Sequence, residues 1–308
     1  MFITITIQTF NHSDYLRATL ESLLAIRCPE GADYEILVVD NNSSDQTPVI
    51  IEEYTKILAP RLRSVFEERQ GLSFARNRAL EEAHGEIVCF IDDDVMVDAG
   101  WLEAVTEAFR KYGAAVVGGR SYLIYTTQRP VWLGAENEVM LSKLDYGDEA
   151  EVGTQKELFG LNFSVTKQMA VEAGGFDTNY GRRGGTLLCG EEIALLSRIR
   201  KNGGLAVYEP RAVVGHVVPT ERLTKKWFFR RIYYGAISME RHAISQGHQA
   251  DLGKLITGTV RCCGGVAKSL LLGNISEKDF FMKEYYAIAN FGRLIERLRH
   301  KLQPIEPA

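Results

Sequence analysis

Short apolar runs alternate with amphipathic stretches along the first 117 residues of the chain. The runs are rich in β-branched residues and indicate buried strands at residues 2–8, 35–39, 62–66, 86–91 and 114–117. Between them apolar residues recur at helical spacing, which predicts helices beginning at Ser13 as N-cap and covering residues 47–58, 73–83 and 101–112. This alternation predicts an α/β fold with a mostly parallel sheet flanked by helices on both faces.

Three of the predicted strands end in polar residues. The three strand ends read Thr9-Phe10-Asn11, Asp40-Asn41-Asn42 and Asp92-Asp93-Asp94. In open parallel sheets ligands bind beyond the carboxyl ends of the strands, so we expect one site at this edge. Three adjacent carboxylates at the end of a buried strand repel one another. A cation set beside them would explain why the chain accepts them.

The second half of the chain is less regular. The pattern weakens between residues 122 and 156, which is consistent with an irregular insertion or a small mixed sheet. It returns as a strand at 159–165, short helices from Lys167 and from 190–192, and a strand at 205–208 that leads to a turn at Pro210. After Thr224 the chain is predicted to be helical and basic through Lys301.

Composition narrows the class of protein. The 308 residues are 45% hydrophobic and 25% charged, as in ordinary globular proteins, and the formal net charge of −4 argues against a nucleic-acid-binding protein. The five cysteines show no metal-ligand spacing, so reduced cysteines in a cytosolic compartment are the simplest interpretation.

Several short motifs occur in a fixed order. They are Thr9-Phe10-Asn11, the run from Val38 to Asp45, Gly71-Leu72-Ser73-Phe74-Ala75-Arg76-Asn77, Phe90-Ile91-Asp92-Asp93-Asp94, Gly174-Gly175-Phe176-Asp177, Gly190-Glu191-Glu192 and His216. Together they make the chain resemble the family 2 glycosyltransferases, inverting nucleotide-sugar enzymes of GT-A fold, over roughly residues 1–240.

The resemblance implies a GT-A, Rossmann-like, mostly parallel sheet flanked by helices, followed by a helical C-terminal extension. We expect a catalytic domain at residues 1–220, with a nucleotide-sugar half at about 1–120 and an acceptor half at about 121–220. Residues 221–308 would form the helical, basic and aromatic extension.

The carboxylate triplet gains a chemical role from the resemblance. A sugar nucleotide leaves a diphosphate that a hard divalent cation, Mn²⁺ or Mg²⁺, can bridge and stabilise. By resemblance Asp94 is the first metal ligand, and Asp92 contacts the ribose, the metal or its water. Alternate residues of a strand share a face, so Asp92 and Asp94 converge if the extended backbone persists. By resemblance His216 completes the metal shell or touches the diphosphate; a structural histidine is the alternative.

The same resemblance implies the nucleotide contacts. Asp40 would read the base, and an Asx-turn made by the same residue is a compatible interpretation. The other expected nucleotide-sugar contacts are Thr9, Phe10, Asn11, Asp93 and Arg76. Because a cation in the first turn of a helix is unfavourable for the helix dipole, we expect Arg76 to have an anionic partner, the nucleotide or Asp92. An exposed surface arginine is the alternative.

Inversion needs a base that takes the proton of the acceptor hydroxyl. By resemblance this base lies in Gly190-Glu191-Glu192, and we favour Glu192 with Glu191 second. Arg182 and Arg183, in a glycine-rich loop, would clamp the diphosphate or an anionic acceptor, or form a plain solvated loop. Trp132 would stack on an acceptor sugar or belong to the core.

Basic and aromatic residues are interleaved at 222–241, as on helices that contact an anionic membrane. A helix that packs its aromatic residues inside the protein and exposes its charges is the competing interpretation. We expect a cytoplasmic protein, with peripheral contact to the inner face of the plasma membrane under the first interpretation.

These observations favour a metal-dependent inverting glycosyltransferase that moves a sugar from a nucleotide-diphosphate sugar, UDP favoured by resemblance, to a saccharide or lipid-linked hydroxyl. Such an enzyme would serve cell-surface polysaccharide or glycolipid synthesis. The alternatives are a nucleotidyltransferase and a non-enzymatic saccharide-binding module. A nucleotidyltransferase would carry a glycine-rich basic loop after its first strand, where this chain has Thr9-Phe10-Asn11-His12-Ser13.

Overall fold

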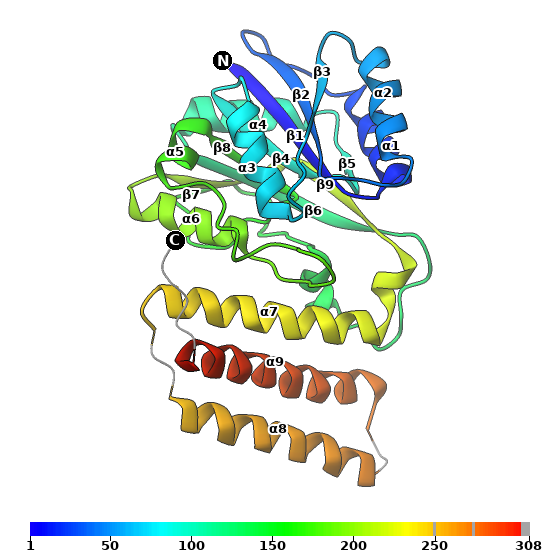
Figure 1. Ribbon diagram of the computed structural model, residues 1–308, viewed down its shortest axis with the longest axis vertical. Helices are drawn as coiled ribbons and strands as arrows, with labels where there is room; N and C mark the ends of the chain where they lie inside the picture. Colours follow the sequence, from blue (N-terminus) through cyan, green and yellow to red (C-terminus); the bar gives the residue numbers. More distant parts are fainter. Residues whose placement is uncertain (249–250, 273–274, 303–308) are drawn as a thin grey trace. The chain divides into compact units, whose positions relative to one another are not determined.

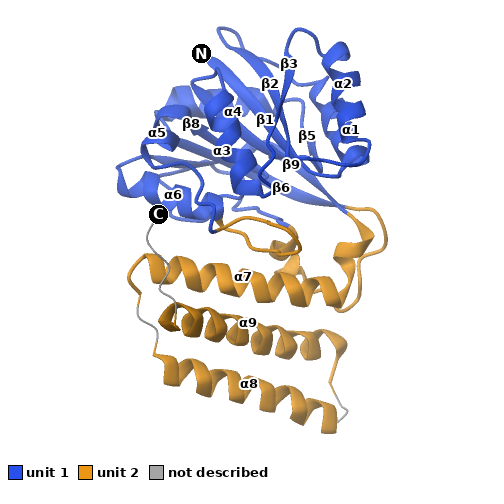
Figure 2. Cartoon of the chain, in the orientation of Figure 1, with its two compact units in different colours: residues 1–124, 142–179, 191–218 blue, residues 125–141, 180–190, 219–308 orange. Residues whose placement is uncertain are grey.

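The structure, a computed structural model, describes residues 1–248, 251–272 and 275–302. The chain forms two compact units, which Figure 2 colours separately. Unit 1 comprises Met1–Ile124, Ser142–Asn179 and Glu191–Val218, and unit 2 comprises Tyr125–Leu141, Tyr180–Gly190 and Pro219–Ala308. Within the predicted extension 221–308, positions 249–250, 273–274 and 303–308 lie outside the described residues. A division into a catalytic domain and an extension stays a proposal.

Unit 1 is built on one mixed sheet in the order β3-β2-β1-β4-β8-β6-β9-β5, with β7 paired to β9 (Figure 1). The strands are β1 (Phe2–Thr9), β2 (Asp33–Asp40), β3 (Leu62–Phe66), β4 (Ile87–Asp92), β5 (Val95–Val97), β6 (Val116–Tyr125), β7 (Glu151–Val152), β8 (Asn162–Thr166) and β9 (Ala206–Val218). The first four pair in parallel, whereas β8 joins β4, β6 joins β8 and β5 joins β9 in antiparallel fashion.

Helices cover both faces of this sheet. They are α1 (Ser13–Leu23), α2 (Thr47–Ile57), α3 (Leu72–Glu82), α4 (Trp101–Tyr112), α5 (Lys167–Glu172) and α6 (Glu191–Lys201). One core contains apolar residues of α1, α2 and α4, and a second core contains those of α3, α5 and α6. Strand β4 contributes Ile87, Cys89 and Ile91 to the first core and Val88 and Phe90 to the second, because successive side chains alternate across a strand.

The predicted α/β class and the mostly parallel sheet flanked by helices are confirmed, with local corrections. Strand β9 runs without a turn through Pro210, so the predicted turn there is wrong. Strand β5 was not predicted because it is only three residues long and directly follows the carboxylates. Ser13 is the first residue of α1, and His12 occupies the N-cap position instead.

Unit 2 contains the 3₁₀ segments η1 (Ala135–Leu141) and η2 (Thr220–Leu223) and the helices α7 (Lys225–Ser245), α8 (Leu252–Leu272) and α9 (Glu277–Leu302). Phe281 of α9 stacks on Phe229 and lies edge-on to Phe228, which is fully buried. Tyr233 stacks on Phe291. The aromatic residues of 222–241 therefore pack inside unit 2, as the competing interpretation of this segment states. Within the described residues no helix is apolar and long enough to cross a bilayer.

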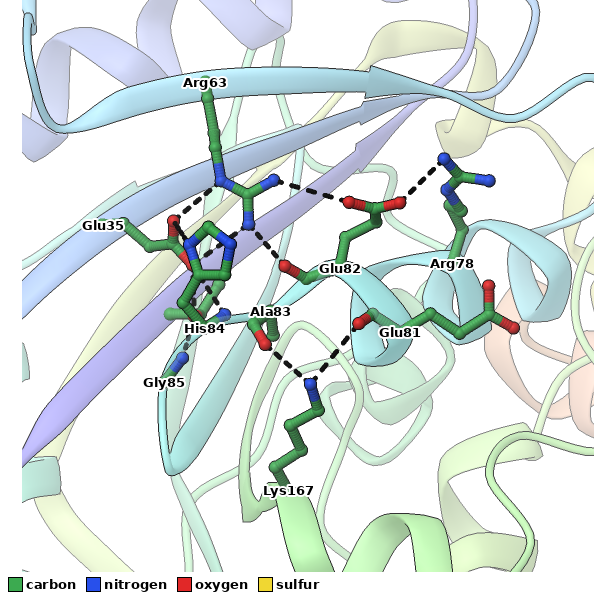
Figure 3. A network of polar contacts seen from close by, with 10 residues as sticks. Glu35, Arg63, Arg78, Glu81, Glu82, Ala83, His84, Gly85 and Lys167 are labelled. Carbon is green, nitrogen blue, oxygen red and sulfur yellow. Dashed lines mark hydrogen bonds and ion pairs between the residues drawn. The ribbon is translucent and has the colours of Figure 1, made fainter.

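A polar network ties the amino-terminal ends of β1, β2 and β3 to the segment that follows α3 (Figure 3). Buried Glu35 accepts hydrogen bonds from Thr4 Oγ1 at 2.8 Å, from Arg63 Nε at 2.8 Å and from the His84 backbone N–H at 2.9 Å. Burial acts to raise the pKa of Glu35, but these donors outweigh it and lower the pKa from 4.5 to about 2. The network is structural, since it lies at the opposite strand ends from the carboxylate triplet.

Glu35→Gln is expected to reduce the free energy of unfolding by about 1–3 kcal/mol at pH 7, because the donors around it lose a charged acceptor. A depressed carboxyl pKa stabilises the folded state above pH 4.5, and this contribution disappears as the pH falls towards 2. Urea unfolding at several pH values should therefore show the difference between wild type and variant shrinking below pH 4.5.

Glu81→Gln is the matched control, since Glu81 is exposed and only its backbone carbonyl joins the network, through Lys167. The control should unfold like wild type throughout. A constant difference for Glu35→Gln down to pH 2 would contradict the assignment of the stabilisation to the ionised carboxylate.

Candidate active site

The polar strand ends predicted to meet do meet at one edge of the sheet. Parallel pairing sets Thr9 of β1 opposite Asp40 of β2 and Gln8 opposite Asp92 of β4. Loops that leave these strands carry side chains to the same edge. Asn11 and Asn42 both have positive φ, at 53° and 68°, so the two loops turn sharply just beyond the sheet.

The carboxylate triplet is split between two surroundings. Strand β4 ends at Asp92, and Asp93 and Asp94 form a turn before β5. The fully buried Thr19 of α1 holds this turn, because its hydroxyl donates to the Asp93 carbonyl at 2.9 Å and accepts from the Val95 N–H at 3.2 Å. The extended backbone therefore ends at Asp92, so the condition for Asp92 and Asp94 to share a strand face is not met.

The turn instead brings Asp93 and Asp94 together with His12. One ligand atom from each of these three side chains lies within 4.8 Å of the others. His12 Nδ1 is 3.0 Å from Asp93 Oδ1. Burial raises the pKa of Asp93 while His12 acts to lower it, so the carboxylate is costly to ionise without further positive charge. Two oxygen donors and an imidazole suit Mn²⁺ better than the oxygen-preferring Mg²⁺.

His216 reaches the same turn from strand β9, more than 120 residues further along the chain. Antiparallel pairing of β5 with β9 sets His216 opposite Val95, the residue that follows Asp94. His216 Nε2 lies 3.4 Å from Asp94 Oδ1, and both side chains are almost completely buried. The predicted partnership of Asp94 and His216 at a metal is therefore geometrically available, and it stays a prediction.

The expected base-reading residue Asp40 accepts a hydrogen bond from Ser43 N–H at 3.0 Å, which is three residues on rather than the two of the predicted Asx-turn. Its neighbour Asn41 is buried and braces the start of α3, because it donates to the carbonyls of Glu67 and Arg69 and accepts from Gly71 N–H. Asp40 and Thr9 are both buried at the strand ends, whereas Phe10 is 44% exposed beside them. The Asn11 side chain accepts from Ser44 N–H at 2.7 Å.

Arg76 of α3 lies fully inside unit 1 with two carboxylates. Its guanidinium Nη1 donates to Glu191 at 2.6 Å and Nη2 donates to Asp92 at 3.1 Å. The alternative of an exposed arginine is wrong, because only 2% of the side chain is exposed. Of the two anionic partners considered, Asp92 is present, and Glu191 is a partner that was not anticipated.

Gly160 makes room for this arrangement. A β-carbon built on Gly160 would lie 2.5 Å from both terminal nitrogens of Arg76, far inside van der Waals contact. The Gly160 N–H also donates to Glu192 Oε1 at 3.3 Å. One glycine therefore touches the arginine on one side and a candidate base on the other.

The two acidic residues that open α6 differ in their surroundings. Burial and then the charge of Glu192 raise the pKa of Glu191 to about 7, with Arg76 acting against them. Glu191 is buried and its Oε1 pairs with Arg76, whereas Glu192 is partly exposed; Oε2 of each has no hydrogen-bond partner among the described residues. A buried oxygen left in this state is costly, as expected where a bound hydroxyl completes the site.

Comparison with known proteins places these features in a family. The model of glycosyl transferase family 2 matches residues 4–168, which is more than half of the chain. The chain belongs to glycosyl transferase family 2. It is a glycosyltransferase that transfers a sugar from a nucleotide sugar, and the predicted family is confirmed.

Two similar proteins match most of this family 2 chain. The glucosyl-dolichyl phosphate glucuronosyltransferase of Haloferax volcanii is 24% identical over 240 residues, which are 76% of this chain and 75% of that protein. The succinoglycan biosynthesis protein ExoM of Rhizobium meliloti is 26% identical over 249 residues, 80% of this chain and 77% of that protein.

A solved structure supports the fold. The mannosyltransferase PcManGT of Pyrobaculum calidifontis, in complex with GDP-Man and Mn²⁺, has a TM-score of 0.63 at 19% identity. The match covers 95% of this chain and 86% of that chain. This likeness confirms the predicted GT-A fold.

The remaining predicted site residues belong to unit 2. Arg182 and Arg183 are exposed on a loop, and their contact with a diphosphate or an acceptor stays a prediction. Trp132 packs edge-on against Phe228 and in a tilted arrangement against Phe281, as expected for the core alternative. His12 was not among the predicted site residues; its place directly after the polar end of the first strand was the available signal.

Gly160→Ala is expected to lower the free energy of unfolding by about 1–3 kcal/mol, because the added methyl group displaces a guanidinium held by two carboxylates. The same displacement moves Glu192, so turnover should fall as well. Urea unfolding and steady-state kinetics measure the two effects.

Gly235→Ala in α7 is the matched control, because a β-carbon there meets no atom within 4 Å. It should be unchanged or slightly more stable, by about 0.4–1 kcal/mol. Equal stability of the two variants would show that Arg76 accommodates the methyl group and that Gly160 does not define its position.

Proposed function

We propose that this enzyme is a metal-dependent, inverting glycosyltransferase that moves a hexose from a nucleoside-diphosphate sugar to a saccharide or lipid-linked hydroxyl. The observation that carries the proposal is the convergence of His12, Asp93 and Asp94, with His216 beside Asp94, at the sheet edge where Asp40 and Thr9 also lie. The names of the relatives, which concern a glucosyl-dolichyl phosphate and succinoglycan, support cell-surface polysaccharide or glycolipid synthesis.

The donor would lie across the carboxyl ends of β1, β2 and β4. Asp40 and Thr9 would contact the base, with Phe10 and Asn11 at the rim of the same edge. UDP is favoured by the resemblance of the site motifs to the family, and GDP is the first competitor, since the mannosyltransferase neighbour was solved with GDP-Man. Asp92, fixed by Arg76 and 35% exposed at its side chain, would contact the ribose.

Asp94 and His216 would hold the divalent cation, with Asp93 and His12 completing the group. The two carboxylates and two imidazoles are ligands that suit Mn²⁺. Because Asp93 and Asp94 are buried, their negative charges are unfavourable unless a positive charge lies beside them. When bound, the cation would neutralise charge that develops on the leaving diphosphate. Asp92 is already paired with Arg76, so a ribose contact suits it better than the metal role the sequence also allowed.

Glu192 would take the proton from the acceptor hydroxyl as the hydroxyl attacks the sugar carbon. Gly160 N–H orients its Oε1, which leaves Oε2 for the acceptor. Glu191 is second choice, because it is buried and its Oε1 is held by the Arg76 guanidinium. In an inverting displacement the base and the leaving group lie on opposite faces of the sugar ring.

Calorimetric titration of UDP, GDP, dTDP and CMP, each with and without Mn²⁺, tests the proposal. One nucleoside diphosphate should bind tightly only when Mn²⁺ is present, and Asp94→Asn should weaken that binding at least about tenfold because a charged ligand is lost. Glu192→Gln should bind the nucleotide as wild type does but turn over about 10²–10⁴-fold more slowly with the corresponding sugar nucleotide.

Asp98→Asn is the matched control, since Asp98 is exposed, lies four residues beyond Asp94 and caps the loop before α4 through Gly100 N–H. It should bind nucleotide like wild type. Failure of all four nucleotides to bind, or release of pyrophosphate rather than a nucleoside diphosphate during turnover, would contradict a glycosyl transfer at this site.

A further inference from the structure

Helix α8 presents apolar side chains to solvent along its whole length. Ile256, Val260, Leu270 and Leu271 are 46%, 67%, 68% and 87% exposed, and Cys263 is exposed between them. Their spacing of three, four and seven residues puts them on one side of the helix. Isolated apolar residues on a surface are ordinary, but an ordered strip on one helix marks an interaction surface. These five residues are called the α8 strip.

The side of α8 that packs against its own unit carries several polar residues. Thr259 and Ser269 are buried there, and Lys283 of α9 donates to the Ser269 hydroxyl at 2.6 Å. Asn290 of α9 contacts Cys262 Sγ at 3.5 Å. The packed side buries Leu255 together with these hydroxyl groups, whereas Ile256, Val260, Leu270 and Leu271 stay outside, unlike an ordinary surface helix whose apolar residues face the core. The apolar side of α8 is therefore available to something other than unit 2.

Charge on α8 has one sign. Lys254, Arg261 and Lys268 are all exposed and follow one another at intervals of seven residues, so they share one side of the helix. At 3.6 residues per turn the centre of this row lies about a third of a turn from the centre of the α8 strip, so the cations flank the strip on one side. Residues 252–272 contain no acidic residue. Asp251 lies just before the helix, and its carboxylate caps the helix by accepting a hydrogen bond from Gly253 N–H.

We propose that α8 docks on an anionic lipid surface, with the α8 strip entering the interface between headgroups and acyl chains and the basic row contacting the headgroups. An apolar face flanked by a row of cations is the pattern of helices that lie in the plane of a membrane. Arg261 and Lys268 lie in the middle and last turns, which suits a helix lying on the surface.

A second copy of the chain is the competing occupant. A face-to-face pair of α8 helices would bring two sets of three cations to one interface, and residues 252–272 offer no carboxylate to pair with them. An anionic surface instead pairs with all three. The inference does not depend on the donor site, since no residue of that site lies on α8.

Sedimentation with vesicles tests the proposal, using the full chain in buffer with a chelator so that the metal site takes no part. Vesicles of phosphatidylcholine alone are compared with vesicles that also contain phosphatidylglycerol. Wild type should bind the anionic vesicles and only weakly the neutral ones, with binding that falls as salt is raised. Each cation near the surface contributes about fivefold to binding, so Lys254→Glu with Lys268→Glu should weaken it at least about twenty-five-fold.

Val260→Ser with Leu271→Ser should also weaken binding without changing charge. The matched control reverses two exposed lysines of unit 1, Lys56→Glu with Lys111→Glu, and should bind like wild type. Circular dichroism checks that each variant folds. Tryptophan emission of Leu271→Trp gives a second readout, which should shift to shorter wavelength with anionic vesicles.

Three results would overturn the proposal. The first is no binding of wild type to anionic vesicles, and the second is binding that the α8 variants leave unchanged. The third is a dimer in light scattering that Val260→Ser with Leu271→Ser converts to a monomer, which would assign the α8 strip to a second copy.

Discussion

The active site depends on one buried guanidinium. Arg76 is held between Asp92, at the end of a central strand, and Glu191, at the start of α6. A buried ion pair adds little net stability, but removal of one partner is expensive because a charge is left without compensation. The arrangement therefore acts mainly on position, because it fixes Asp92 and the helix that carries the candidate base relative to each other.

Segments that are distant in sequence pack around the guanidinium of Arg76. Gly160, on the loop before β8, supplies the space that any side chain would fill, and its N–H holds Glu192. With Asp92 paired to Arg76, the turn at Asp93 and Asp94 lies beside His12 and His216. The split of the carboxylate triplet explains how three adjacent acids are accommodated, since one is neutralised by arginine and two lie beside histidines.

The buried strands and amphipathic helices of unit 1 could be predicted from the sequence. A strand buried on both faces appears as a short continuous apolar run, and a helix appears as apolar residues spaced three or four apart. The partner Glu191, 115 residues from Arg76, could not, since no local pattern encodes a long-range ion pair. The extended backbone that would let Asp92 and Asp94 share a face ends at Asp92, and the sequence did not indicate the turn at Asp93 and Asp94. The aromatic residues around Phe228 looked equally suited to a membrane or a core, and their contacts with Phe281 could not be predicted from the sequence.

A double-mutant cycle in folding stability tests the shared guanidinium most directly, because it needs neither donor nor acceptor. Asp92→Asn and Glu191→Gln each leave Arg76 with one directly bonded carboxylate, whereas the double variant leaves none. Urea unfolding should show the double variant less stable than the sum of the single effects predicts, with a coupling energy of about 0.5–3 kcal/mol. Effects that add to within about 0.3–0.5 kcal/mol would contradict a single arginine serving both carboxylates.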